Sequence, residues 1–132
     1  MSKPVATPKS IEQVAEETVV YALEAFYFVE SGLQSTTKSL RRTRKRRGGH
    51  VTGQELAEGL REAAQRRWGM LAGLVLERWG VRNTYDFGRI VYAMIDAGMM
   101  GKTEEDSIED FRDVYDFQTA FTKSYKIAPV NA

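Results

Sequence analysis

The sequence has no cysteine, and it contains one histidine, His50, and three prolines in 132 residues. Without cysteine the chain has no disulfide bonds, no thiolate metal sites and no cysteine nucleophiles. A single imidazole does not make a histidine zinc site, and we expect His50 to flank a helix start at Thr52. The few prolines, with 42% hydrophobic residues, indicate a packed globule rather than global disorder. We therefore expect a folded domain with no metal and no cofactor.

Long apolar runs are also missing. The longest uncharged, apolar-rich stretch is Trp68 to Leu76, which has nine residues, whereas a membrane-spanning helix needs about 20. Residues 1–9 lack the apolar stretch of a signal peptide. These absences predict a cytoplasmic protein with no membrane span. We expect residues 1–9 to be disordered and residues 126–132 to be loose.

Basic residues, in contrast, are concentrated in one place, residues 38–47, which we call the basic segment. It holds seven of the 19 basic residues and no acid: Lys38, Arg41, Arg42, Arg44, Lys45, Arg46 and Arg47. The other 12 basic residues stand against 18 acids, so the net charge of +1 combines a segment of +7 with a body of about −6. A segment this dense in charge attracts phosphate, an anionic lipid surface or an acidic protein face.

Start and stop signals predict four or five helices. Ser10 with Gln13, and Thr52 with Glu55, form capping boxes, in which two side chains satisfy unpaired backbone N–H groups at a helix start. The predicted helices cover residues 11–33 with a possible bend near Tyr21, then 53–68, 71–79 and 84–97, and a last short one begins at Asp116. The predicted buried stripes are Leu71, Ala72, Val75 and Trp79 in the third helix and Phe87, Ile90, Val91, Met94 and Ile95 in the fourth.

The predicted fold class is all-α, with one compact domain of four or five helices over residues 10–125. The region 38–49 forms a basic loop or helix end in this prediction. After Gly98 we expect short irregular turns or a small hairpin, and with a hairpin the order of helix, turn and helix also fits a winged helix whose wing is that hairpin. That wing, residues 98–117, would carry seven acids and two bases, which would repel phosphate. A wing would therefore serve as a scaffold or protein contact.

The leading functional hypothesis is that the basic segment contacts the phosphate backbone of RNA, a ribosome or DNA. Neutralising phosphates releases counterions, and arginine forks suit paired phosphate oxygens. No aromatic residue lies between Thr36 and Val51, so base stacking has no support and contact with the backbone is expected. The alternative is that the segment is merely solvated or folds back on the protein's own acids.

A second hypothesis is a protein-interaction or scaffold module without nucleic acid. A partner, or the basic segment of another copy, would dock on the acids Glu104, Glu105, Asp106, Glu109 and Asp110. Tyr27 and Phe28 point away from the stripe of Phe26, so they either widen the buried arc or leave an apolar patch for a partner. No carboxylate pair is marked out for acid–base chemistry, so we expect a non-enzymatic protein.

Five stretches carry a family resemblance: His50-Val51-Thr52-Gly53-Gln54-Glu55-Leu56, Glu77-Arg78-Trp79-Gly80-Val81-Arg82, Asp86-Phe87-Gly88-Arg89-Ile90-Val91, Lys102-Thr103-Glu104-Glu105-Asp106, and Glu109-Asp110-Phe111 with Tyr115-Asp116-Phe117. They resemble a planctomycete and verrucomicrobial family of small uncharacterised proteins and cover most of residues 21–121. The resemblance implies a bacterial source and one compact domain, and it implies no activity, cofactor or partner. Met70 stands where the family pattern has proline, and the basic segment lies outside that pattern.

Overall fold

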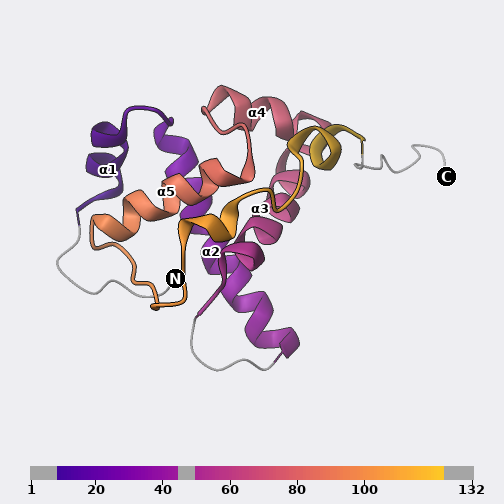
Figure 1. Cartoon of the computed structure of the whole chain (residues 1–132). Helices are drawn as coiled ribbons and strands as arrows, with labels where there is room; N and C mark the ends of the chain where they lie inside the picture. The colour runs from indigo at the N-terminus through magenta and orange to yellow at the C-terminus, as the bar shows by residue number, and fades with distance from the viewer. Residues whose placement is uncertain (1–8, 45–49, 124–132) are drawn as a thin grey trace.

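Helices make up the framework of the computed structural model, which describes residues 9–44 and 50–123 (Figure 1). The α-helices in these ranges are α1 (Ile11–Thr18), α2 (Leu23–Arg44), α3 (Gly53–Trp68), α4 (Ala72–Arg78) and α5 (Thr84–Asp96). Three shorter turns complete them: η1 (Gly69–Leu71), η2 (Ile108–Phe111) and the π-helical η3 (Thr119–Lys123). No β-strand occurs in the described ranges. The predicted all-α fold class is confirmed.

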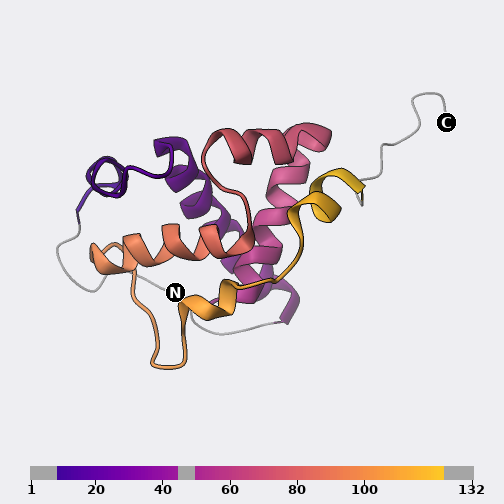
Figure 2. The ribbon, with the colours of Figure 1, turned by 45° about the horizontal axis from the view of Figure 1, so that its top comes forward.

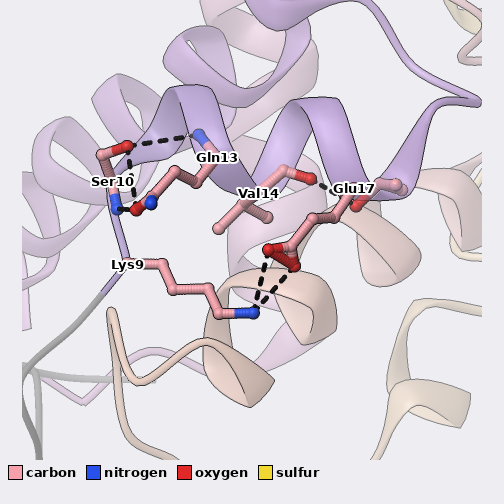
Figure 3. A network of polar contacts seen from close by, with 6 residues as sticks. Lys9, Ser10, Gln13, Val14 and Glu17 are labelled. Atoms are coloured by element: carbon pink, nitrogen blue, oxygen red, sulfur yellow. Dashed lines mark hydrogen bonds and ion pairs between the residues drawn. The ribbon is translucent and has the colours of Figure 1, made fainter.

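The first helix begins at the predicted capping box. The Gln13 N–H donates to Ser10 Oγ over 3.2 Å, and the Ser10 N–H donates to Gln13 Oε1 over 2.9 Å (Figure 3). Lys9, which we expected in a disordered segment, is held just before it, because its ammonium pairs with Glu17 at 2.7 Å. Residues 1–8 and 124–132 lie outside the described part of the chain, so the predictions made for them stay predictions.

The bend predicted near Tyr21 separates α1 from α2. Val19 has a φ of 68°, and the Val20 N–H donates to the Thr18 carbonyl over 2.7 Å. This bond closes a three-residue γ-turn, which is a rare conformation for a β-branched residue. The chain then turns inward, because the Tyr21 side chain is buried and the Ala22 N–H donates to the Trp79 carbonyl over 3.1 Å. The predicted first helix is therefore two helices.

Helices α2 and α3 pack closely, and α3 runs back along α2 (Figure 1). The contact uses glycine on both sides. A Cβ on Gly32 would lie 2.3 Å from Leu60 Cδ2, and one on Gly59 would lie 2.0 Å from Thr36 Oγ1. A larger residue at either position would force the opposite side chain to shift. The pair therefore fixes the position of the second half of α2, which carries the start of the basic segment.

The predicted limits of α3 are confirmed. The Glu55 N–H donates to Thr52 Oγ1 over 3.1 Å and the Thr52 N–H donates to Glu55 Oε1 over 3.0 Å, so the capping box starts α3 at Gly53. At the other end, Gly69 has a φ of 54°, in the left-handed range that glycine adopts at little cost. The following turn, η1, was not predicted.

The inward stripe predicted for the third helix is wrong at Leu71. This side chain is 60% exposed, whereas Ala72 and Leu76 are buried. The physical reason is that residues 69–71 form a 3₁₀ turn before α4 starts. A 3₁₀ turn rotates the chain by more per residue than an α-helix does, so a stripe drawn with α-helical spacing misplaces Leu71.

Helix α5 crosses α2 and α3 and forms the centre of the core (Figure 2). Asn83 caps it by accepting the Asp86 N–H over 2.9 Å. The predicted stripe is confirmed, because Phe87, Ile90, Val91 and Met94 are buried and Ile95 is partly buried. Gly98, with a φ of 79°, ends the helix as expected.

Of the two forms expected after Gly98, the short turns are confirmed, and the hairpin, with the winged helix that depends on it, is wrong. The segment makes a turn at residues 103–106 and then η2, which Ser107 caps. Phe111 is buried against Gly53 and Gly88. Thr84 Oγ1 donates to the Phe111 carbonyl over 2.5 Å and accepts the Val114 N–H over 3.2 Å. The segment is therefore attached to α5 along its length instead of pairing with itself.

Candidate functional site

The first half of the basic segment is helical. Helix α2 continues through Lys38, Arg41 and Arg42 to Arg44, which agrees with the expected helix end rather than with a loop. The backbone of Arg44 is described but its side chain is not, and Lys45, Arg46 and Arg47 lie outside the described residues. The end of α2 lies beyond α5, with α3 beside it (Figure 1).

Three cations cover the outward face of this end of α2: Lys38, Arg41 and Arg42, all exposed. At about 100° per residue, they fall within one arc opposite Thr36 and Leu40. Thr36 is buried and Leu40 packs partly against the core. In the described ranges Lys38 and Arg42 have no ion pair with a carboxylate. We call these three residues the cationic face.

Local electrostatics affect the cationic face in two opposite ways. Cations near a helix C-terminus are favourable because the last carbonyls carry partial negative charge. Lys38 and Arg42 are four residues apart on one helix face, where like charges destabilise a helix by about 0.2–0.5 kcal/mol per pair. A bound anion would relieve that repulsion.

The other side of α2 is acidic. A groove of about 400 Å³ between α2 and α3 is lined by Ser35 and Ser39 on one wall and by Glu55, Glu58 and Glu62 on the other. Two of these carboxylates already have partners, because Glu55 belongs to the capping box and Glu58 pairs with Arg61 at 2.8 Å. Their charge still repels phosphate from that side. Within the described residues, an anion therefore meets less negative charge on the cationic face than on the groove side of α2.

The two aromatic residues singled out from the sequence have different surroundings. Tyr27 is 44% exposed and its hydroxyl donates to Glu12 Oε1 over 2.6 Å. This bond lowers the pKa of Glu12 and raises that of Tyr27. Phe28 is only 2% exposed, so it is wrong as a contact residue. It is covered by Trp68 and Trp79, with ring centroids 5.2 and 5.9 Å away.

The five acids Glu104, Glu105, Asp106, Glu109 and Asp110 are called the acidic segment here. Most of them form hydrogen bonds or ion pairs within the molecule. Asp106 accepts the Thr103 N–H over 2.9 Å and lies 3.5 Å from His50 Nε2. Glu109 pairs with Arg112 at 2.5 Å, and this contact lowers the pKa of Glu109. Asp110 accepts the Ser107 N–H over 3.1 Å. Of the five predicted contact acids, Glu104 and Glu105 are exposed at the tip of the turn.

One polar cluster was not recognised from the sequence. Asp86 is buried and accepts hydrogen bonds from the Tyr21 hydroxyl and, over 2.9 Å, from the Arg82 N–H. Arg89 lies 3.7 Å from the same carboxylate. Burial, and then the bond to Asp86, raises the pKa of Tyr21 well above its ordinary value. Asp86 looks like an ordinary first-turn acid in the sequence, and nothing local indicates its distant partner.

A second feature that the sequence did not reveal is a groove of about 790 Å³ beside α4. Met70, Leu74 and Glu77 form one wall, and residues 113 and 115–118 form the other. We call it the α4 groove. It combines apolar and acidic side chains that are far apart in the sequence. Its only local signal is the run of apolar residues after Gly69.

Two other kinds of functional feature, a metal site and a membrane-spanning helix, have no candidate in the described ranges. There, no three or more His, Asp or Glu residues gather so as to hold a metal ion. None of the helices in these ranges is both long enough and apolar enough to cross a membrane. Searches against protein family models, curated proteins and solved structures returned no match. The resemblance to the planctomycete and verrucomicrobial family therefore stays a prediction.

Proposed function

We propose that this is a cytoplasmic, non-enzymatic binding protein that holds the phosphate backbone of a nucleic acid on the basic segment. The partner is RNA, free or in a ribosome, or DNA. One observation supports this most strongly: Lys38, Arg41 and Arg42 are exposed together on one face of α2, and no acid of the described chain pairs with Lys38 or Arg42. Arg44 to Arg47 continue the same segment in the sequence.

The chemistry of the face favours the backbone over the bases. Arginine offers a planar fork of donors that matches two phosphate oxygens, and lysine adds a mobile point charge. No aromatic side chain stands between Thr36 and Val51 to stack on a base. Contacts with phosphate position a protein on nucleic acid without reading its sequence. We therefore expect binding with little sequence preference and with strong dependence on salt.

The second hypothesis, docking of a partner on the acidic segment, has weaker support. Asp106, Glu109 and Asp110 already bond within the molecule, and although Glu109 stays exposed in its pair with Arg112, only Glu104 and Glu105 form an exposed pair at the tip of the turn. An exposed pair of this size contributes little to binding energy, because charges at the edge of an interface mainly affect association rate. We therefore do not base the function on it.

The first test removes the cationic face. In the variant Lys38→Ala/Arg41→Ala/Arg42→Ala, affinity for a fluorescent single-stranded RNA, measured by anisotropy over a range of salt concentrations, should fall. The slope of log affinity against log salt should become shallower by about 2, because each phosphate contact contributes about 0.7. The matched control is Arg78→Ala/Arg82→Ala/Lys102→Ala, which removes three exposed cations that do not line the groove between α2 and α3. The control should keep the parent slope.

Two results would contradict the proposal. Equal losses in the test and control variants would show that only net charge matters. Unchanged binding after replacing Arg41, Arg42, Arg44, Lys45, Arg46 and Arg47 by alanine would show that the basic segment is not the contact. A duplex DNA probe tested in parallel decides between RNA and DNA, since a preference appears as different affinities at one salt concentration.

A further inference from the structure

The α4 groove leaves an unusual amount of apolar surface uncovered. Met70 is 63% exposed and Leu74 is 55% exposed, and both line the groove. Helix α4 has seven residues and buries only Ala72 and Leu76, so its other face has no partner in the described chain. Exposed apolar side chains gathered around a concave surface mark an interaction site more often than scattered ones do.

The edges of this groove are acidic. Its lining includes three carboxylates, Glu77, Asp113 and Asp116, against one guanidinium, Arg82. Asp116 accepts the Thr119 N–H over 2.9 Å, while Glu77 and Asp113 are exposed. The floor is more apolar, with Val81 buried and Tyr115 and Phe117 partly buried. The groove therefore offers apolar contact at its centre and negative charge at its edge.

From this complementarity we infer that the α4 groove binds a cationic amphipathic helix of a partner protein. Apolar side chains one helical turn apart pack on Met70 and Leu74, and lysine or arginine side chains at the edge meet Glu77 and Asp113. The two walls are a short helix and an irregular segment, and no strand edge exists in the described ranges to pair with an extended peptide. A helix, whose backbone bonds are internal, suits such walls best.

The basic segment of a second copy fits this groove less well. Between residues 38 and 47 its only apolar side chain is Leu40, which already packs partly on the protein's own core. It therefore does not supply the two apolar anchors that Met70 and Leu74 call for. A nucleic acid is also disfavoured, because phosphate would meet Glu77, Asp113 and Asp116.

The test uses the full ¹⁵N-labelled chain and two synthetic amphipathic peptides of about four helical turns. Both carry leucine on one face, and the other face carries lysine in one peptide and glutamate in the other. The leucine–lysine peptide should shift the NMR signals of Met70, Leu74, Glu77 and Asp113. The leucine–glutamate peptide should leave them unchanged, because like charges at the edge oppose binding.

A pair of matched variants locates the site. Leu74→Asp should weaken binding of the leucine–lysine peptide by about tenfold or more, because it places a charge where an apolar anchor packs. Val20→Asp is the control, since Val20 is 65% exposed, carries the same change and does not line the groove. It should bind like the parent. Urea unfolding of both variants should show that each one folds.

Several outcomes overturn the inference. These are equal binding of both peptides, equal weakening by Leu74→Asp and Val20→Asp, or no binding at all. Contacts between residues 124–132 and the Met70 or Leu74 methyl groups in the peptide-free chain would make the protein's own segment the occupant. Self-association that Leu74→Asp abolishes would make it a second copy. The variant Lys38→Ala/Arg41→Ala/Arg42→Ala should bind the peptide normally. The peptide experiment therefore tests the groove independently of whether the proposed nucleic-acid binding fails.

Discussion

The two ends of α3 have opposite surface chemistry. At its start, beside Thr52, the end of α2 presents the exposed cations Lys38 and Arg42. At its finish, after Trp68, the α4 groove presents Met70 and Leu74 with an acidic edge. The net charge of +1 indicates neither the cationic end nor the acidic groove, because their opposite charges largely cancel in the total. The two proposed sites therefore lie at opposite ends of one helix, where a bound anion and a cationic apolar partner would not compete for the same residues.

The largest expected effect on stability is that of Phe121→Ala, which removes a buried ring next to the α4 groove. Phe121 is 1% exposed and lies edge-on to Phe117, with ring centroids 5.0 Å apart, behind the groove wall. Removing a buried ring costs about 3–5 kcal/mol of the free energy of unfolding, which urea titration measures. Leu74→Ala is the control, because this side chain is exposed, and it should cost far less. Similar losses of unfolding free energy in the two variants would show that burial of Phe121 does not stabilise this end of the molecule.

A smaller loss of stability is expected from Tyr21→Phe, which removes a buried hydrogen bond close to the α4 groove. The variant leaves buried Asp86 without its hydroxyl donor. Losing a hydrogen bond to a charged group costs about 1.5–3 kcal/mol. Arg82 lines the groove and donates its own N–H to the same carboxylate. Urea unfolding at neutral pH should show the loss, and an unchanged free energy would contradict the role given to this bond.

The same variant tests a pH dependence. Burial raises the pKa of Tyr21 above its ordinary value of 10.0, so the unfolded state ionises first as pH rises. The Tyr21 contribution to stability is therefore complete below pH 10 and is lost progressively above it. Tyr115, whose pKa burial also raises, adds to the loss. Tyr21→Phe should lose less stability than the parent between neutral pH and pH above 10, and parallel curves would contradict this.

Gly59→Ala tests the contact between α3 and α2 that positions the helical half of the basic segment. The added Cβ would stand 2.0 Å from Thr36 Oγ1, and overpacking of this kind costs about 1–3 kcal/mol. Thr36→Ala should restore most of the loss in the double variant, since Thr36 Oγ1 is buried without a hydrogen-bond partner. Unfolding of the two single variants and the double variant measures this coupling. Additive losses would show that the two residues do not meet.

The smallest of these effects is that of Thr52→Ala, which removes the cap at the basic end of α3. Loss of the side chain that accepts the Glu55 N–H should cost about 1 kcal/mol. Thermal unfolding measures it, with Ser10→Ala at the start of α1 as the comparison. An unchanged midpoint for Thr52→Ala would mean that the helix starts without this bond.

The parts of the fold that could be predicted depend on neighbours in the sequence. Capping by Ser10 and Thr52 and the left-handed glycine at Gly98 involve only residues within a few positions of each other. The failure at Leu71 is also local, because a 3₁₀ turn precedes α4, whereas the failure at Phe28 involves distant partners. Phe28 is buried because Trp68 and Trp79 cover it, and no window around Phe28 contains them.

The candidate sites show the same limit. The basic segment could be recognised because its residues lie within ten positions of one another, but whether it forms a loop or a helix end was undecided, and the cationic face depends on the continuation of α2 to Arg44. The α4 groove could not be predicted, because its walls come from residues 70–84 and 113–118. In the folded chain, the hydrogen bond from Thr84 to the Phe111 carbonyl holds the second of these segments against the start of α5. A surface built from two distant segments has no signature in either of them.

The contact between Trp68 and Trp79 has a practical consequence. These are the two tryptophans of the chain, and their rings lie edge to face with centroids 5.2 Å apart. They flank η1 and α4 and line a second pocket, beside Tyr27 and Phe28, rather than the α4 groove itself. Selective excitation of tryptophan therefore reports on this end of α3, and we expect an occupant of the neighbouring groove to change the emission more than an anion bound at the far end.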